Sequence, residues 1–472
     1  MEPGERRLCF AVFAAALLLY LAFRSLYFNF DGVACAIAVE LSDFKHLVHG
    51  NHLAYGVVGW LFNRAWLILG YKGPALLALQ ILDGLLGAAG AAVLASLVRR
   101  SGRPDREAAL AGAALAVSHA WWFWSLEAQV YMLGALFAAL AAREALGERP
   151  RPAVIGVWQA CAALGHVGHL MALPALAWLL AKKKGRKALA PSLGAFAAVL
   201  LVSYAAAGLL AVRPRCELEL RLWLLGSAAL GKHRTFLWHS TAPLDALRAW
   251  SVMTLRVFCE FSGRTGAAWL AGLVLAALPI AAAARGAHQG GREARFWLLW
   301  LAGYATLFLF WEPFTIVYRV SDLIGLWALV MLGLDSWRPL ARTAALVAWT
   351  AAAGAYNLAF VVRPASAPAS NPEYLEARWV SAHTPENAWV FAVGRGPVYL
   401  SYFAHRNPLE LRYLEDEKSL FTRLDVLRAR GEKVFTTDRA LEISGLGPAL
   451  TRYGMRTEAS GDGLTLYRVS GF

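Results

Sequence analysis

Charged residues are scarce in this sequence of 472 residues, in which Asp, Glu, Lys and Arg make up only 17% of the total. A soluble globular protein carries about a quarter of such residues. The apolar residues, 58% of the chain, come in blocks of roughly twenty, the length that crosses the core of a bilayer. The composition therefore excludes an ordinary soluble domain and predicts a polytopic α-helical membrane protein.

Other common signals are missing as well. The five cysteines do not have the spacing of a metal site. A disulfide among the three expected outside the membrane, Cys35, Cys216 and Cys259, is open but not predicted. No repeat of solenoid period occurs, and GRGP (394–397) is only a turn signal rather than a phosphate-binding loop. The first apolar run lacks a small-residue cleavage site, which indicates an uncleaved signal anchor.

The net charge of +14 does not indicate nucleic-acid binding, because Lys and Arg cluster in short loops between the apolar blocks. That bias is typical of the cytoplasmic loops of membrane proteins. We therefore expect the lipid bilayer as the surroundings, no nucleic-acid partner, and a cytoplasmic N-terminus.

The apolar block 52–71 decides the topology. It is long enough to cross a membrane, but Asn63 and Arg64 stand near its middle, and a central Arg costs about 2.5–3.5 kcal/mol on insertion scales. If it crossed, the later basic loops would fall outside, so we expect an interfacial or re-entrant helix. About eleven spans remain, at 8–28, 74–98, 107–124, 128–147, 152–165, 169–181, 188–212, 266–285, 295–311, 319–336 and 341–362. The two short spans around Gly165–His169 are candidates for broken helices that line a cavity.

The composition changes after residue 362, which predicts a second domain. We expect a transmembrane domain at 1–362 with outer loops at 29–73 and 213–265, and a Pro/Ala/Ser linker at 363–370. Strand-like AWVFAV and KVFTT alternate with helix-like runs in 371–472, which predicts a small α/β domain. The odd number of spans puts this domain outside. The basic outer loop 213–265 is either a segment that faces headgroups or a site for an anionic lipid.

Two acids follow the first expected span, in the outer stretch 28–63. Asp31 is either a helix-end residue or a general base that takes a proton from an acceptor hydroxyl at the mouth of a cavity. Glu40 is the second choice for that role.

Three histidines lie in the same stretch. His46, His49 and His52 have i, i+3, i+6 spacing and, with an added carboxylate, would make a metal set. Gly50 and Asn51 disfavour one continuous helix through all three. We therefore prefer interface or substrate hydrogen bonding and predict no metal site, although a divalent metal stays open.

Further polar residues stand where spans are expected to reach the outer surface. Glu127, accompanied by Gln129 and Tyr131, is either part of an aromatic interface belt or a carboxylate that faces the bundle interior. His166 and His169 share a helix side at i, i+3 spacing, either as a buried polar pair or as site residues.

The last group of candidates is Glu312, Tyr318 and Arg319, at the outer ends of two later spans. An Arg that begins a span either extends to the headgroups or binds a phosphate.

The order of these residues resembles a known family. A membrane-exit Asp31 is followed by a His-led apolar helix, then by FWSLEAQVYML and GHVGHLMALPAL. This order, over roughly residues 10–360, looks like that of the protein O-mannosyltransferase-like multi-pass proteins of the GT-C glycosyltransferase superfamily. HGNHLAYG takes the place of a His-Pro-Pro-Gly-Tyr-Pro-like segment, keeping His49 or His52 but neither proline. The other matching positions are Trp124, Glu127 or Gln129, Val130, Tyr131, His169, Pro174, Tyr318 and Arg319.

The resemblance implies a glycosyltransferase of hexosyl or mannosyl type. It would move a sugar, with inversion, from a polyprenyl-phosphate donor to a protein, lipid or glycan acceptor on the outer face. On our hypothesis Asp31, which matches the Asp that opens the first outer loop in that family, is the base, and we predict no cofactor. The lipid phosphate would be stabilised by Arg319 and one or more of Arg213, Arg215 and Lys232. The substrate-binding residues would be Glu40, His49, His52, Glu127, Tyr131, His166, His169, Glu312 and Tyr318.

The alternative is a non-catalytic protein of the same shape, either a flippase for a lipid carrier or a membrane scaffold. Transporters show inverted repeats with broken helices in matching halves, and this sequence shows no such repeat. The missing loop prolines would suit a degenerate enzyme, so the alternative stays open. The Ala/Gly/Arg-rich composition favours a bacterial inner membrane.

Overall fold

The computed structural model describes residues 2–225, 242–410 and 417–470. The chain divides into two compact units. The helical unit comprises Met1–Ser25 and Ala38–Pro364, and the sheet unit comprises Leu26–Ile37 and Ala365–Phe472. A short segment near the N-terminus therefore belongs with the C-terminal residues.

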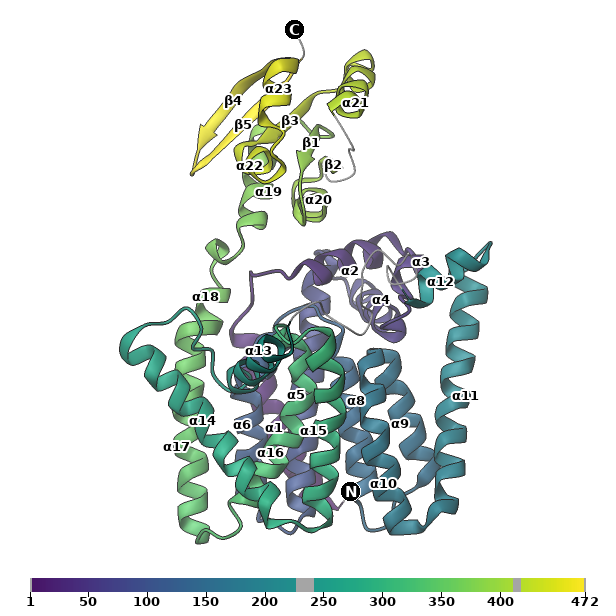
Figure 1. The fold of residues 1–472 in the computed structure, drawn as a ribbon, viewed down its shortest axis with the longest axis vertical. Helices are drawn as coiled ribbons and strands as arrows, with labels where there is room; N and C mark the ends of the chain where they lie inside the picture. The colour runs from purple at the N-terminus through teal and green to yellow at the C-terminus, as the bar shows by residue number, and fades with distance from the viewer. Residues whose placement is uncertain (1, 226–241, 411–416, 471–472) are drawn as a thin grey trace. The chain divides into compact units, whose positions relative to one another are not determined.

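The long helices of the helical unit run side by side in a bundle (Figure 1). A helix lies in each of the eleven ranges expected to span the membrane. The helices are α1 (Pro3–Ala22), α5 (Ala75–Arg100), α6 (Asp105–Val117), α8 (Tyr131–Leu146), α9 (Pro152–Gly165), α10 (Leu173–Lys184), α11 (Leu189–Ala207), α14 (Gly266–Gln289), α15 (Gly291–Trp311), α16 (Val320–Gly333) and α17 (Pro339–Asn357).

Six helical segments in the described part of the chain are long and apolar enough to cross a membrane. They are Ala75–Arg100, Arg186–Val212, Gly266–Gln289, Gly291–Trp311, Ile316–Gly333 and Pro339–Ala365. The expected polytopic helical architecture is thus confirmed, whereas the count of about eleven spans stays a prediction.

The expected span 107–124 is interrupted, which corrects the prediction of one helix there. α6 ends at Val117, and α7 (His119–Ser125) begins after Ser118, whose backbone is extended. The first two amides of α7 donate to the carbonyl groups of Phe258 and Val257, each at 3.0 Å. These two carbonyl groups replace the i−4 acceptors that a continuous α6 would supply. The helix axis can therefore break at Ser118 without leaving buried amides unpaired.

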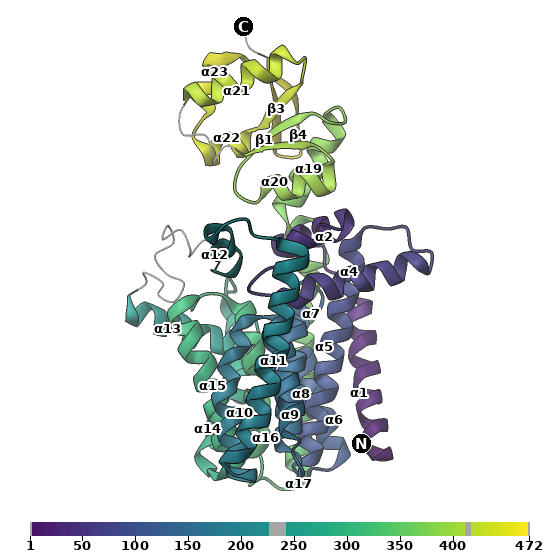
Figure 2. The ribbon, with the colours of Figure 1, turned by 90° about the vertical axis from the view of Figure 1, so that its right-hand side faces the viewer.

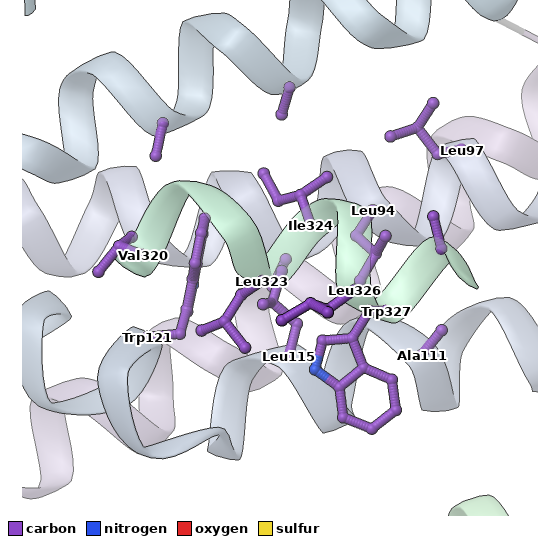
Figure 3. Close-up of a cluster of buried hydrophobic side chains, with 14 of the residues drawn as sticks. Leu94, Leu97, Ala111, Leu115, Trp121, Val320, Leu323, Ile324, Leu326 and Trp327 are labelled. Atoms are coloured by element: carbon purple, nitrogen blue, oxygen red, sulfur yellow. The ribbon is translucent and has the colours of Figure 1, made fainter. Parts of the chain in front are cut away.

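The core of the bundle forms around α16 (Figure 3). All of its residues but Leu332 are buried. Leu323, Ile324 and Trp327 pack against leucines of α5 and α6. The Trp327 indole N–H donates to Ser118 Oγ at 3.0 Å, which ties this core to the break between α6 and α7. α16 and α5 therefore lie at the centre of the helical bundle.

Shorter helices lie across one end of the bundle. α4 (Leu53–Ile68) packs against α5 and α9, and α13 (Pro243–Arg256) packs against α14 and α15. Both views show these helices crosswise to the bundle axis (Figures 1 and 2). In α4, Asn63 is buried whereas Arg64 is exposed and lies over the Trp60 ring. α4 is not among the six candidate spans, and its interfacial position stays a prediction.

The sheet unit contains a five-stranded sheet of order β2-β1-β3-β5-β4. The first three strands in space are parallel and the last two are antiparallel. The strands are β1 (Trp389–Ala392), β2 (Asn407–Glu410), β3 (Val434–Thr437), β4 (Met455–Gly461) and β5 (Leu464–Val469). The predicted small α/β domain is confirmed, since AWVFAV and KVFTT form β1 and β3, which are adjacent and parallel.

Short helices flank this sheet. They are α19 (Pro372–His383), α20 (Gly396–Tyr399), η8 (Leu400–Ala404), α21 (Glu417–Ala429), α22 (Asp438–Ser444) and α23 (Gly447–Gly454). α21 covers the sheet with Leu420 and Leu424, which pack with Phe391 and Val434. Within the stretch expected as a linker, α18 (Arg363–Ala365) and η7 (Pro368–Ser370) are short helical turns. The unit also takes in the first eight residues of α2 (Phe30–Leu41).

Candidate functional site

The histidine stretch forms a turn between α3 (Phe44–Leu47) and α4. The rings of His49 and His52 stack with centroids 4.4 Å apart and planes 11° apart. No helix passes through Gly50 and Asn51, as the sequence predicted. The turn therefore presents two imidazoles together at the start of α4.

The carbonyl groups of this turn are bound from three other elements. The donors lie in η1 (Val167–Ala172), in α11 and in α12 (Glu217–Leu225). The bonds join Val167 N to Asn51 O (2.8 Å), Tyr204 Oη to Gly50 O (2.6 Å) and Trp223 Nε1 to Val48 O (2.6 Å). The turn is thus fixed against segments more than a hundred residues away in the sequence.

His166 interrupts the chain between α9 and η1, where broken helices were expected. Its backbone is extended, and its ring lies 4.9 Å from that of Tyr131 and 5.9 Å from that of Tyr318. Its Nδ1 accepts a hydrogen bond from Gly168 N at 3.1 Å, so in the neutral imidazole Nε2 carries the proton. Trp311 stacks on the His166 ring at 6.3 Å and on the Tyr318 ring at 5.3 Å.

His169 is buried beside this group of rings. Its Nδ1 lies 2.6 Å from the Tyr304 hydroxyl, and its carbonyl accepts from Gln159 Nε2 at 2.5 Å. The His166 and His169 rings lie 6.5 Å apart. The structure therefore joins three predicted candidates, Tyr131, His166 and Tyr318, to His169 through directly packed rings, and adds Trp311 and Tyr304 from α15.

The charge of the histidine turn follows from its surroundings. Burial lowers the pKa of His52 to about 3, with further lowering by His49 and His166. His52 is therefore a neutral imidazole at physiological pH. A neutral imidazole has both a donor and an acceptor nitrogen, which suits recognition of hydroxyl groups.

Two acids, Asp83 and Glu127, are buried in the helical unit, and only one of them was identified from the sequence. The predicted Glu127 accepts a hydrogen bond from Ser25 Oγ. The unpredicted Asp83, in α5, accepts from Tyr55 Oη at 2.6 Å and from Gln129 N at 2.7 Å. Its other carboxylate oxygen has no hydrogen-bond partner in the described residues. An acid inside an apolar span, as in ALLALQILDGLL, was the signal that could have identified it.

Arg319 is buried, with 2% of its surface exposed, and it is engaged by its neighbours. Its Nε donates to Asp322, its Nη2 donates to Thr254 Oγ1 at 2.8 Å, and its guanidinium lies 4.7 Å over the Trp250 ring. These contacts tie the start of α16 to α13. A phosphate could be bound by this group only if the contact with α13 changed.

The exposed Arg213 lines a groove beside the histidine turn. A cavity of about 570 Å³ lies between α11 and α12, and Tyr204 and Trp223 form part of its wall. The same two side chains bind the turn through Gly50 and Val48. Arg215 is also exposed, whereas Lys232 lies outside the described residues. Arg213, one of the proposed phosphate-binding cations, thus lines a groove whose Tyr204 and Trp223 also bind the backbone of the histidine turn.

The remaining candidates lie elsewhere. Asp31 is the second residue of α2 and is exposed; it belongs to the sheet unit. Glu40, in the helical unit, accepts from Ala75 N at 2.8 Å and so caps the start of α5. Glu312 accepts from Thr315 Oγ1 at 2.9 Å at the end of α15. Glu40 and Glu312 therefore each have a local structural partner.

The described residues contain no group of three or more His, Cys, Asp or Glu side chains that could hold a metal ion. His46 pairs instead with Asp43, with 2.6 Å between Nδ1 and Oδ2. Partial burial raises the pKa of Asp43, but hydrogen bonds from His46 outweigh this effect and lower it overall.

No protein-family model matches the sequence, and no curated protein matches it. Solved structures nevertheless show that the chain has a GT-C-like fold, the fold of a class of membrane glycosyltransferases. ArnT from Cupriavidus metallidurans in the apo state matches with a TM-score of 0.67 at 12% identity, over 98% of both chains. The structure of ArnT bound to undecaprenyl phosphate matches with a TM-score of 0.65 at 13% identity, over 99% of this chain and 98% of that chain.

A more distant likeness is to the oligosaccharyltransferase of Archaeoglobus fulgidus, in a complex with Zn and sulfate. Its TM-score is 0.57 at 13% identity, over 90% of this chain and 67% of that chain. Identities as low as these concern the fold, and the role of each residue must be argued from its chemistry.

Proposed function

We propose that this chain is an inverting glycosyltransferase that moves a sugar, of hexosyl or mannosyl type, from a polyprenyl-phosphate donor to an acceptor on the extracytoplasmic face. The observation that carries the proposal is the full-length likeness of fold to ArnT, a protein whose structure holds undecaprenyl phosphate. Coverage of 99% of this chain means that the likeness includes the C-terminal residues as well as the helices.

The reaction is a single displacement. The Asp31 carboxylate accepts the proton of the acceptor hydroxyl, whose oxygen forms a bond to the anomeric carbon of the sugar. The bond from that carbon to the phosphate oxygen breaks, and the phosphate leaves with the electron pair as the polyprenyl carrier. Because one displacement occurs at one carbon, the configuration inverts. Asp31 is suited to hold a negative charge, since it lies in the first turn of α2, where the helix dipole favours a carboxylate.

The groove beside α11 suits the phosphate end of the donor. Arg213 supplies a positive charge at a wall that is otherwise largely apolar and aromatic, a combination that fits a charged head on a hydrocarbon chain. Arg215 and Lys232 are further candidates for this contact. Arg319 would act from a distance, because its guanidinium is already occupied by Asp322 and Thr254.

The group of rings suits the sugar. Neutral His52, together with the ring nitrogen of His166 and the hydroxyl groups of Tyr131 and Tyr318, offers both donors and acceptors next to aromatic faces. His169 packs against His166 in this group, and Glu127 is a further candidate for binding the sugar or the acceptor. Six apolar helices make the chain an integral membrane protein; we assign it to a bacterial inner membrane, with the N-terminus cytoplasmic and the sheet unit outside.

The test is transfer of radiolabelled sugar by purified protein in lipid nanodiscs, with a panel of polyprenyl-phosphate sugars and cell-extract acceptors. Wild type is compared with Asp31→Asn. The matched control is Asp462→Asn, an exposed Asp in the sheet unit at positive φ, where Asn is equally well tolerated.

We expect transfer from one donor by wild type and by Asp462→Asn, and a loss of at least about a hundredfold in Asp31→Asn, the size of effect typical of a general base. Full transfer by Asp31→Asn would contradict the base assignment. No transfer with any donor by well-folded wild type would favour a flippase or a scaffold.

A further inference from the structure

The segment Leu26–Phe30, which we call the strap, leads into α2 and belongs to the sheet unit. The sheet unit binds its main chain at several points. Leu26 N donates to Ala365 O at 2.8 Å. Tyr399 Oη donates to Phe28 O at 2.6 Å, and Asn371 Nδ2 donates to Tyr27 O. The strap is therefore held by its backbone, which leaves little freedom in its path.

The conformation of Phe28 is the clearest sign of this constraint. Its φ of 45° lies in the left-handed region, which is a genuine outlier for a bulky residue. Its side chain is 3% exposed, and its ring lies 4.9 Å from that of Tyr374 and 5.1 Å from that of Phe403. A backbone conformation of this kind persists only where the surrounding structure fixes it. The aromatic side chains and the hydrogen bonds to the Phe28 carbonyl supply that surrounding structure.

The constrained backbone of the strap leads directly into the first turn of α2, which contains Asp31. Asn29 caps α2: its Oδ1 accepts from Asp31 N at 3.0 Å, and its carbonyl accepts from Val33 N at 3.1 Å. The Phe30 ring lies 5.9 Å from the Arg395 guanidinium of the sheet unit. The direction of the first turn of α2, and with it the position of the Asp31 side chain, is therefore set by the strap.

We propose that the sheet unit positions Asp31 through Asn371 and Tyr399, whose side chains hold the backbone of the strap in place. This inference rests on the proposed function, because it takes Asp31 as the base. The inference gives the sheet unit a part in the transfer step itself. It makes Asn371 and Tyr399 positioning residues rather than catalytic ones. Burial raises the pKa of Tyr399 to about 12, so its hydroxyl keeps the proton that it donates to the strap.

Two variants each remove a side-chain donor to the strap. Tyr399→Phe keeps the ring and removes only the hydroxyl. Asn371→Asp keeps the oxygen that caps α19 by accepting from Tyr374 N, since Asp is as good an N-cap as Asn, but it replaces the donor to the strap with a second acceptor. The matched controls in the same unit are Tyr453→Phe, whose hydroxyl donates to Asp425, and Asn407→Asp, whose amide donates to Asn387.

The first measurement is hydrogen exchange of the intact protein in nanodiscs, followed by mass spectrometry of a peptide that covers residues 26–34. We expect the amides of Asp31 and Val33 to exchange faster in Tyr399→Phe and Asn371→Asp than in wild type and the two controls. Unchanged exchange in both variants would overturn the proposal, whatever the activity of the protein.

The second measurement separates kcat from the donor KM. We expect kcat to fall by about tenfold to a hundredfold in the two variants, since a displacement of about 1 Å in a reacting group has such a cost, with the donor KM unchanged. A general loss of folding would instead lower the melting temperature and the active fraction while leaving the kcat of the remaining enzyme intact. Faster exchange with unchanged kcat would overturn the positioning role. Absence of transfer by wild type would overturn the proposed function, and it is recognised separately because the exchange result does not depend on transfer.

Discussion

The hydroxyl of Tyr55 donates a hydrogen bond of 2.6 Å to the carboxylate of Asp83, and both side chains are almost completely buried. The bond joins α4, which lies across the end of the bundle, to α5 at the centre of the bundle. The same carboxylate oxygen accepts from Gln129 N at 2.7 Å. Asp83 therefore links α5 both to α4, which begins directly after His52, and to the chain between Glu127 and Tyr131.

Tyr55→Phe should lower the free energy of unfolding by about 1–3 kcal/mol, because a buried carboxylate loses a donor that nothing replaces. Unfolding in mixed micelles, followed by tryptophan fluorescence, measures the change. Tyr71→Phe is the control: its exposed hydroxyl donates to Pro74 O, and its loss should change the free energy by less than about 0.5 kcal/mol. Equal effects of the two substitutions would contradict the anchoring role of Asp83.

The apolar blocks of the sequence predicted where the long helices lie, but they could not show which residues meet inside the bundle. Asp83 stands in a block that reads as a span, and its partners Tyr55 and Gln129 lie 28 and 46 residues away. Local pattern carries no information on such pairings. The strap is a stronger case, because Phe28 and its partner Tyr399 lie 371 residues apart. Two of the five strands of the tail, β1 and β3, could by contrast be predicted, because the β-branched and aromatic runs AWVFAV and KVFTT identify them locally.

The contact partner of Arg319 could not be predicted from the local sequence pattern either. Its place at the start of a span could be predicted, together with Tyr318 beside it. Whether it faces headgroups, a phosphate or a buried acid depends on packing, and in the structure it pairs with Asp322, three residues further on. The nearby acid was visible in YRVSD, but its burial was not.

Arg319→Met should lower the free energy of unfolding by about 3–5 kcal/mol, because it leaves Asp322 buried without its charge partner. Arg319→Met/Asp322→Leu should recover most of this loss, since apolar replacement of a whole buried ion pair is often neutral. The same unfolding assay measures both variants. Transfer activity of the double variant then tests the predicted phosphate contact: retained activity would show that Arg319 does not bind the donor phosphate.

The lowered pKa of His52 predicts that the free energy of unfolding depends on pH. Its pKa is about 3 in the folded protein, below the value of about 6.5 for a free histidine. The unfolded chain thus takes up a proton at a higher pH than the folded chain. The free energy of unfolding should therefore fall as the pH drops from about 6.5 toward 3, by at most about 1.4 kcal/mol per pH unit from this group, and it should not depend on His52 at higher pH.

Unfolding curves of wild type and His52→Gln between pH 4 and pH 8 check this slope. The two proteins should run parallel above about pH 7, and wild type should lose stability more steeply below it. Parallel curves throughout would show that His52 is not kept neutral by its surroundings.

Gly50 tests the anchoring of the histidine turn. A Cβ atom added there would overlap the carbonyl oxygen of Trp223. Gly50→Ala should therefore displace α12, weaken the bond from Trp223 to Val48, and lower the free energy of unfolding by about 1–3 kcal/mol, as overpacking does. Gly194→Ala is the control, because a Cβ there would meet open space within α11, where Ala favours the helix. Equal stability of the two variants in the unfolding assay would contradict the close packing of the turn.

If Arg213 contacts the donor phosphate, its substitution should weaken donor binding and leave the transfer step unchanged. One charge-assisted contact to a phosphate contributes about 1.5–3 kcal/mol, so Arg213→Gln should raise the donor KM by about tenfold or more while kcat changes little. Initial rates of sugar transfer over a range of donor concentrations measure both constants. Arg186→Gln is the matched control, since this exposed Arg stands before the opposite end of α11. A rise in KM confined to Arg213→Gln would place the donor phosphate in the groove beside the histidine turn, whereas equal effects of both variants would indicate only a general attraction of an anionic lipid to a basic protein.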